Sequence, residues 1–233
     1  MAVTGELLSQ EALKIFSAEC GYIWGTAGVM WTREKQTELE HDRAGDNNYA
    51  MAIKYGSKWI GHIVYDCSGL ILALLKTHDI KVPHGSNSQW NNSLSEKGTI
   101  EGDIPVGSAV FKVRNGNDYY HVGIYVGNGM VVEARGTTAG VVESRLSSWT
   151  HYGLLKGVTY SKDDGIEIGS EAIVDVPNDG TLNVRAKPSL TSRKTDVIYE
   201  GEKVEVLEQD VAWAKIRYTK EGYVMKKYLK AVE

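Results

Sequence analysis

Only two cysteines, Cys20 and Cys67, occur among the 233 residues of this chain. Two cysteines are too few for the framework of several disulfides on which small secreted domains depend. Metal-ligand spacings are missing as well, since the sequence contains neither C-x-x-C nor H-x-x-x-H. The sequence therefore excludes a disulfide scaffold, and we expect no metal and no organic cofactor.

Long apolar runs and blocks of basic residues are also lacking. The longest apolar candidate, residues 70–75, is far shorter than the roughly 18 residues of a membrane span. The formal net charge is −4, and no basic block indicates a nucleic-acid partner. With 42% hydrophobic and 24% charged residues, the composition is that of a globular protein that can bury at least one full core.

Two regions of different composition follow one another along the chain. The polar, glycine-containing segment TYSKDDGIEIGSEA at 159–172 is typical of a linker. Mixed helix and strand signals precede it, and a pure strand pattern follows it. We therefore predict an α+β domain over 1–160, a linker over 161–170 and a small all-β barrel over 171–233.

The first region contains two clear helix patterns and a hairpin pattern. Apolar residues at helical spacing predict a helix over Gln10–Glu19, with Ser9 as its N-cap. Residues 68–77 are apolar almost all round, which predicts a buried helix. Two β-rich runs flank Gly-Asn-Gly at 127–129 and predict a hairpin.

Cys67 stands where the second helix is expected to begin. A cysteine nucleophile must ionise, and the free N–H groups and the dipole at a helix start favour the thiolate. The same N–H groups could hold an oxyanion. His121 is a candidate base, and Glu133 is a candidate partner for the His121 ring.

The length of the hairpin loop decides whether His121 and Glu133 can meet. With a three-residue loop at 127–129, Gly123 faces Glu133 and His121 lies diagonally across on the same face, about 7–8 Å away. A two-residue loop at 128–129 would put the two side chains on opposite faces. The hypothesis therefore requires an odd loop length, with Glu133 accepting the Nδ1 proton of His121.

Taken singly, each of these residues is more often structural than catalytic. A cysteine before an apolar helix is usually a core residue, and a glutamate in a strand usually faces solvent. Read together, a cysteine, a histidine and an acid on the same hairpin form the pattern of a cysteine hydrolase. Cys20 is expected to be a buried packing residue.

Three blocks of the sequence resemble the papain-like NlpC-type cell-wall cysteine peptidases. They are GYIWG (21–25), YDCSGLILALLK (65–76) and HVGIYVGNGMVVEARG (121–136). The resemblance implies a nucleophile, a base and a third polar group at Cys67, His121 and Glu133. It implies that Tyr22, Asp66 and Ser68 line the substrate cleft.

The chain departs from the family pattern at several positions. Glu133 stands where histidine is more common, and His84 follows Pro83 where arginine is common. The stretch between Gly25 and Asp66 is longer than the minimal pattern, and the role of residues 26–60 stays open. Its charged part is expected to be a solvated helix or loop.

The last region resembles the bacterial SH3-like domain that accompanies cell-wall hydrolases. The resemblance rests on LNVRAKPSLTS, WAKI and EGYV, and it implies binding to peptidoglycan. Trp213, Tyr218 and Tyr223 could form the binding surface, but aromatic residues in so small a barrel are more often core, and we favour the core for Trp213.

These resemblances imply an endolysin-like thiol peptidase that acts on the bacterial cell wall. The implied substrate is the stem peptide of peptidoglycan, cleaved at the D-γ-glutamyl–diamino acid bond. A cysteine amidase or acyltransferase and a catalytically inactive wall-binding adaptor are the alternatives. The start of the chain shows no signal-peptide pattern, so either lysis by a phage or mobile element releases the protein or a leader has been removed. The oligomeric state is left open.

Overall fold

The computed structural model describes residues 2–160, 168–176, 180–189, 191–209, 213–218 and 221–231. The chain divides into two compact units, Met1–Tyr160 and Ser161–Glu233, each with a hydrophobic core of its own. The linker predicted over 161–170 falls mostly outside the described residues, which omit 161–167. Among the helices of the described residues, none is long and apolar enough to cross a membrane.

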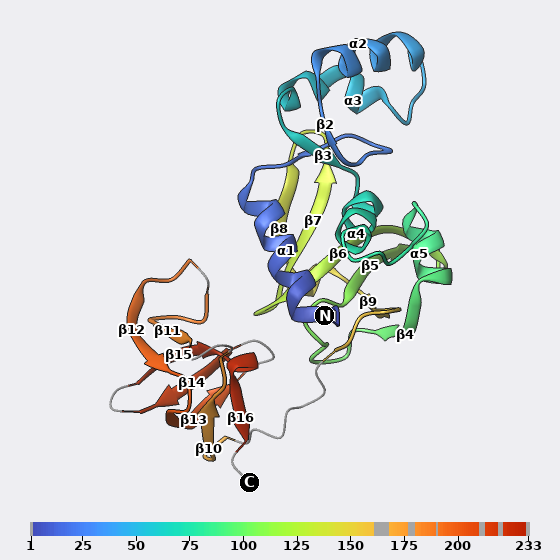
Figure 1. Ribbon diagram of the computed structural model, residues 1–233. Helices are drawn as coiled ribbons and strands as arrows, with labels where there is room; N and C mark the ends of the chain where they lie inside the picture. Colours follow the sequence, from blue (N-terminus) through green and yellow to red (C-terminus); the bar gives the residue numbers. More distant parts are fainter. Residues whose placement is uncertain are drawn as a thin grey trace. The chain divides into compact units, whose positions relative to one another are not determined.

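The N-terminal unit is built on a six-stranded antiparallel sheet in the order β4-β9-β5-β6-β7-β8. Its strands are β4 (Leu94–Thr99), β5 (Ala109–Arg114), β6 (Asp118–Gly127), β7 (Met130–Gly136), β8 (Gly140–Arg145) and β9 (His151–Leu155). Helices α1 (Gly5–Ser17), α4 (Cys67–Lys76) and α5 (Ser86–Asn92) pack against β6 (Figure 1). This arrangement confirms the predicted α+β class for the unit.

Helix α4 lies at the centre of this core, as its apolar sequence predicts. Leu70, Ile71 and Leu75 are completely buried. Burial of each such side chain contributes about 1.5–3 kcal/mol. At the N-terminus of α4, the Asp66 side chain caps the helix by accepting the Gly69 N–H at 2.6 Å. The first turn of α4 is therefore held both by apolar packing and by a charged cap.

Helix α1 begins earlier than the sequence predicts. Its N-cap is Thr4, whose hydroxyl accepts the Leu7 N–H, and not Ser9. Ser9 instead lies inside the helix, 5% exposed, and its hydroxyl donates to the Val126 carbonyl at 3.4 Å. The prediction failed because a serine and a threonine cap look alike in sequence, and packing on β6 decides between them.

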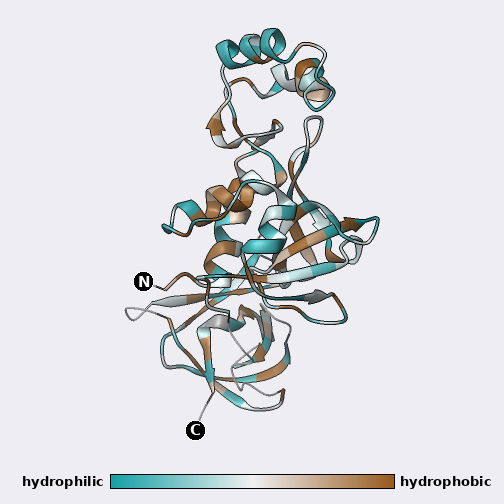
Figure 2. Cartoon of the chain, turned by 90° about the vertical axis from the view of Figure 1, so that its right-hand side faces the viewer, coloured by the Kyte–Doolittle hydropathy of each residue, from teal (hydrophilic) through white to brown (hydrophobic). Residues whose placement is uncertain are grey.

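Residues between β2 and β3 form a lobe beside a three-stranded sheet, which has the order β1-β3-β2. The elements are β1 (Gly21–Tyr22), β2 (Ala27–Met30), α2 (Arg33–Asp42), α3 (Ala50–Tyr55), η1 (Gly56–Trp59) and β3 (Ile63–Tyr65). Helix α2 is strongly hydrophilic (Figure 2), as expected for a solvated helix. Gln36 is its buried anchor, since its amide accepts the Trp31 indole N–H and donates to the Ala52 carbonyl.

The β6-β7 hairpin reaches the predicted register by a different route. Asn128 and Gly129, both with positive φ, form a two-residue turn that pairs Gly127 with Met130. A register shift between Tyr125 and Gly127 then adds one residue to β6. The predicted three-residue loop is thus wrong, but the bulge restores the odd offset that keeps His121 and Glu133 on one face.

The C-terminal unit is a seven-stranded antiparallel sheet in the order β12-β11-β15-β14-β13-β10-β16. Its elements are β10 (Glu171–Val174), β11 (Thr181–Arg185), β12 (Lys194–Tyr199), β13 (Lys203–Gln209), β14 (Trp213–Arg217), β15 (Glu221–Met225), η3 (Lys226–Tyr228) and β16 (Leu229–Ala231). Val184, Val206 and Ile216 are fully buried in its core. Trp213 is 4% exposed, so the core position favoured from the sequence is correct.

Candidate active site

Cys67 is the first residue of α4, and its side chain is half-buried. Burial and the neighbouring Asp66 carboxylate raise the pKa of the Cys67 thiol to about 11. The backbone N–H groups of Val122, Ser68 and Cys67 itself act in the opposite direction. The start of a helix therefore favours the thiolate, as expected, but does not ionise this thiol unaided. The contact with Val122 also shows that the sulfur lies against the strand that carries His121.

His121 and Glu133 form a buried pair on β6 and β7. The distance from His121 Nε2 to Glu133 Oε2 is 2.6 Å, with the His121 side chain 12% exposed and that of Glu133 fully buried. The expected contact through Nδ1 is wrong. The two residues lie diagonally across the hairpin, and Nε2 is the ring nitrogen farther from the backbone, so it spans that separation. Nδ1 is left for another partner.

Four groups surround the Glu133 carboxylate, three from the other strands β5, β6 and β8 and one, Arg135, from β7 itself. Burial raises its pKa, but hydrogen bonds from His121, Arg135 and Ser144 outweigh burial and lower the pKa to about 2. The guanidinium of Arg135 donates to Oε1 from Nε at 3.2 Å and from Nη2 at 2.9 Å. The Lys112 ammonium lies 4.0 Å from the same oxygen. Glu133 is therefore a carboxylate at neutral pH and can only accept from Nε2, which places the proton of the neutral His121 ring there.

Trp149 completes the support of the histidine ring. It follows the short helix η2 (Leu146–Ser148) and is 4% exposed. Its ring stacks on His121 with centroids 5.4 Å apart, and the Lys112 ammonium lies over its ring. Its indole N–H donates to the Ser144 hydroxyl, which in turn hydrogen-bonds Glu133. The ring plane and the tautomer of His121 are thus both fixed.

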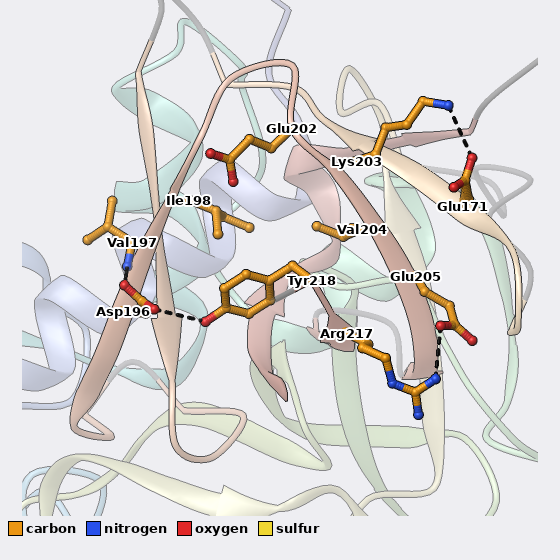
Figure 3. Close-up of a pocket in the computed structure, with 10 residues that line it drawn as sticks. All are labelled: Glu171, Asp196, Val197, Ile198, Glu202, Lys203, Val204, Glu205, Arg217 and Tyr218. Atoms are coloured by element: carbon orange, nitrogen blue, oxygen red, sulfur yellow. Dashed lines mark hydrogen bonds and ion pairs between the residues drawn. The ribbon is translucent and has the colours of Figure 1, made fainter. Parts of the chain in front are cut away.

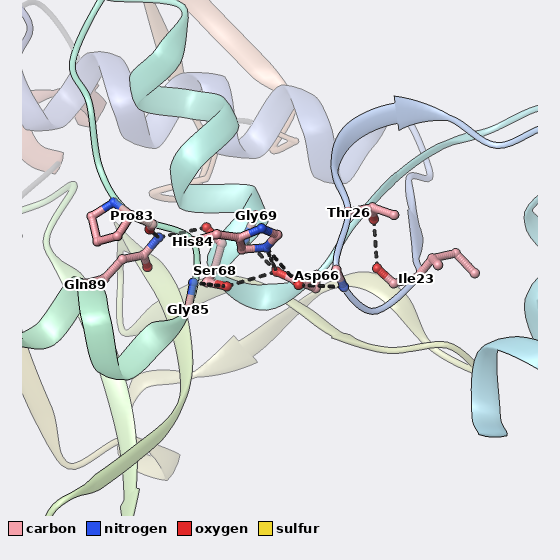
Figure 4. A network of polar contacts seen from close by, with 10 residues as sticks. Ile23, Thr26, Asp66, Ser68, Gly69, Pro83, His84, Gly85 and Gln89 are labelled. Carbon is pink, nitrogen blue, oxygen red and sulfur yellow. Dashed lines mark hydrogen bonds and ion pairs between the residues drawn. The ribbon is translucent and has the colours of Figure 1, made fainter. Parts of the chain in front are cut away.

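Asp66 is the centre of a second polar network (Figure 4). Besides capping α4 through Gly69, it accepts the Gly25 N–H at 2.8 Å and the Ser68 hydroxyl at 3.0 Å. His84 Nε2 lies 2.9 Å from both carboxylate oxygens. Asp66 therefore joins the turn between β1 and β2, the start of α4 and the loop before α5, and this structural role was not predicted from the sequence.

Ser68 and Tyr22 lie close to Cys67, as the sequence predicts. Ser68 is 3% exposed, and its hydroxyl accepts the Gly85 N–H at 3.1 Å. Tyr22 is half-buried, and burial, followed by the charges of Cys67 and Asp66, raises its pKa. The structure brings these residues together around the start of α4, while their contact with substrate remains a prediction.

Sequence reasoning missed five supporting residues, which are Arg135, Lys112, Ser144, Trp149 and His84. Arg135 could have been predicted, because it lies two positions after Glu133 on the same strand and therefore on the same face of the sheet. Lys112 pairs with His121 across β5 and β6, a register visible only in the sheet. Trp149 and His84 arrive from loops, for which no local periodicity exists. Among the described residues, no group of three His, Cys, Asp or Glu side chains could hold a metal ion.

The C-terminal unit has a hollow of about 650 Å³ on its surface (Figure 3). It is lined by Glu171, Asp196, Val197, Ile198, Glu202, Lys203, Val204, Glu205, Arg217 and Tyr218. Lys203 pairs with Glu171, and Arg217 pairs with Glu205. The Tyr218 hydroxyl donates to Asp196 at 3.3 Å. Tyr218, unlike the buried Trp213, therefore lines an open surface.

Comparison with known proteins supports both resemblances. Residues 48–157 match the NlpC/P60 family, and residues 180–230 match the bacterial SH3 domain. A stretch of 90 residues is 38% identical to the peptidoglycan endopeptidase RipA of Mycobacterium tuberculosis, covering 39% of this chain and 18% of RipA. The chain thus spans less than a fifth of the length of that relative.

Solved structures of similar proteins match about two thirds of the chain at low identity. The peptidoglycan hydrolase RipB from Mycobacterium tuberculosis is 17% identical with a TM-score of 0.43, over 65% of this chain and 67% of RipB. NlpC2 from Trichomonas vaginalis is 20% identical with a TM-score of 0.41, over 63% of this chain and 45% of NlpC2.

Proposed function

Because residues 48–157 carry an NlpC/P60 domain and residues 180–230 a bacterial SH3 domain, we propose that this protein is a cysteine peptidase that hydrolyses peptidoglycan. The observation that carries the proposal is the buried His121–Glu133 pair. His121 is followed on its strand by Val122, whose backbone contacts the Cys67 sulfur. RipA, named a peptidoglycan endopeptidase, supports the choice of substrate.

The reaction begins with a proton transfer within the site. Glu133 keeps a proton on Nε2, so Nδ1 of the neutral His121 ring has a free lone pair that can take the proton of Cys67. A thiol with a pKa of about 11 gives up that proton at neutral pH only when a cation forms beside it. The thiolate and the imidazolium therefore stabilise each other, and the Glu133 carboxylate stabilises the imidazolium.

Peptide cleavage follows as two acyl transfers. The thiolate adds to the carbonyl carbon of the scissile bond, and N–H groups at the start of α4 stabilise the oxyanion. The imidazolium gives its proton to the leaving amine as the C–N bond breaks, which leaves a thioester on Cys67. His121 then takes a proton from water as hydroxide adds to the thioester, the C–S bond breaks to release a carboxylic acid, and the imidazolium returns its proton to the Cys67 thiolate. No proton or electron is left unaccounted for.

The finer features of this function are also part of the proposal. The bond cleaved is the D-γ-glutamyl–diamino acid bond of the stem peptide, and Tyr22, Asp66 and Ser68 line the cleft that receives it. The C-terminal unit tethers the enzyme to the wall and so raises the local concentration of substrate.

Digestion of purified peptidoglycan tests the proposal. The wild type should release fragments whose masses, read by mass spectrometry, identify the bond that is cut. Cys67→Ala should release none, whereas Cys20→Ala, which changes a buried packing cysteine, should cut at the same bond as the wild type. Fragments released by Cys67→Ala would overturn the assignment of the nucleophile. Intact peptidoglycan with the wild type would favour an amidase or acyltransferase on another substrate, or an adaptor.

A further inference from the structure

The mechanism uses only one of the two oxygens of Glu133. Oε2 receives the His121 ring, whereas Oε1 points to the Arg135 guanidinium, which donates to it from two nitrogens at 3.2 and 2.9 Å. Building on the proposed function, we propose that Arg135 is a positioning residue that occupies Oε1 and thereby reserves Oε2 for His121. Lys112 assists it from 4.0 Å.

The location of Arg135 suits this task. Arg135 and Glu133 are two positions apart on β7 and share one face, yet the Glu133 side chain is fully buried while that of Arg135 is 47% exposed. The carboxylate of a glutamate can rotate about χ3, its last side-chain torsion, because the preferred range of that torsion is broad. The two Arg135 donors converge on Oε1 and restrict this rotation more than the single ammonium of a lysine would. The guanidinium thus fixes the carboxylate from the solvent side.

Besides orienting the Glu133 carboxylate, Arg135 contributes a positive charge to the site. The groups that face the Glu133 carboxylate are His121 on β6, Lys112 on β5, Arg135 on β7 and Ser144 on β8. Two permanent cations therefore balance one buried carboxylate. Removal of the Arg135 charge leaves the site more negative, and every protonation step in it then shifts to higher pH.

Alkylation of Cys67 measures this effect without any assumption about the substrate. The full-length wild type, Arg135→Gln, Arg135→Lys and the matched control Arg145→Gln on β8 are treated with iodoacetamide over a range of pH. The rate for the Cys67 peptide is read by mass spectrometry. Thermal midpoints are recorded, and kcat and KM are measured on a soluble muropeptide.

The expected results distinguish the effect of the two N–H donors of the Arg135 guanidinium from the effect of its positive charge. Arg135→Gln should shift the pH profile of alkylation upward and lower kcat about tenfold, with little change in KM, because a charge-assisted hydrogen bond is lost. Arg135→Lys should restore the position of the pH profile but not the full kcat, since lysine keeps the charge and lacks the fork. Arg145→Gln should match the wild type.

Two outcomes would overturn the proposal. One is an Arg135→Gln protein with the pH profile and kcat of Arg145→Gln. The other is equal loss in Arg135→Gln and Arg135→Lys together with an equal fall in their thermal midpoints, which indicates a purely structural residue. If the wild type cleaves no muropeptide but the alkylation profiles shift as stated, the proposed function fails and the role of Arg135 stands.

Discussion

Two buried carboxylates of the N-terminal unit, Asp66 and Glu133, each hold a histidine ring but serve different regions. Asp66 caps α4 and joins it to the turn between β1 and β2 and to the loop of His84. Glu133 holds His121 on β6, the strand whose Val122 contacts the Cys67 sulfur. Both sites pair an acidic side chain with a histidine, so such a pair does not by itself identify a catalytic site. What distinguishes the His121–Glu133 pair is that Val122, the residue after His121, contacts the Cys67 sulfur.

Removal of the Glu133 charge should have the largest effect on activity. Glu133→Gln can no longer fix the proton on Nε2 or stabilise the imidazolium, and kcat/KM should fall about a thousandfold. Steady-state kinetics on a soluble muropeptide measure this. Glu143→Gln, on neighbouring β8, is the matched control and should retain activity. Equal activities of the two variants would erase the contrast between Glu133 and an ordinary acid.

Removal of the Asp66 charge should act on stability first. Asp66→Asn loses the charged cap of α4 and weakens the bonds from Gly25, Ser68 and His84, at a cost of about 2–4 kcal/mol in the free energy of unfolding. Urea denaturation followed by circular dichroism measures it. An unchanged midpoint would contradict the structural role, and a raised KM at constant kcat would in addition support the predicted contact of Asp66 with substrate.

The contribution of Glu133 to the stability of the folded protein should depend on pH. Its pKa is about 2 in the folded protein against an ordinary value of 4.5, so the unfolded chain binds the proton more readily. Its contribution is therefore fully present above the unfolded pKa and is lost as the pH falls from 4.5 toward 2. The difference in thermal midpoint between wild type and Glu133→Gln should shrink over this interval. A difference in thermal midpoint that does not change with pH would mean that the pKa of Glu133 is the same in the folded and the unfolded protein.

The smallest effect is expected at His84. Its side chain is 36% exposed, and Asp66 keeps its backbone and hydroxyl donors without it. His84→Ala should lower the free energy of unfolding by less than about 1 kcal/mol, as for exposed ion pairs. The same denaturation experiment checks this. A loss as large as that of Asp66→Asn would make His84 the main support of the network.

The sequence was sufficient to predict the buried helix that follows Cys67 and the hairpin that carries His121 and Glu133. The apolar run after Cys67 specifies a buried helix, and the alternation around Gly-Asn-Gly specifies a hairpin, because burial dictates both patterns. The fold class and the two family resemblances were confirmed. The local details were not accessible: the bulge between Tyr125 and Gly127 does not follow from alternation, yet it sets which face carries His121.

Contacts between distant segments could not be predicted. Lys112 approaches Glu133 because β5, β6 and β7 lie side by side in the sheet, and Trp149 reaches His121 from the loop between η2 and β9. The choice of Nε2 over Nδ1 depends on the reach of the ring across that sheet. Periodicity fixes which face a side chain occupies, whereas its partners follow from the assembled layers.

The most direct measurement is the rate at which iodoacetamide modifies Cys67 as a function of pH, in the wild type and in His121→Ala. The account predicts rapid modification near neutral pH in the wild type. In His121→Ala the rate should be low there and rise only toward the pKa of about 11 of the isolated thiol. Identical profiles in the two proteins would contradict the claim that the His121 imidazolium makes the Cys67 thiolate available.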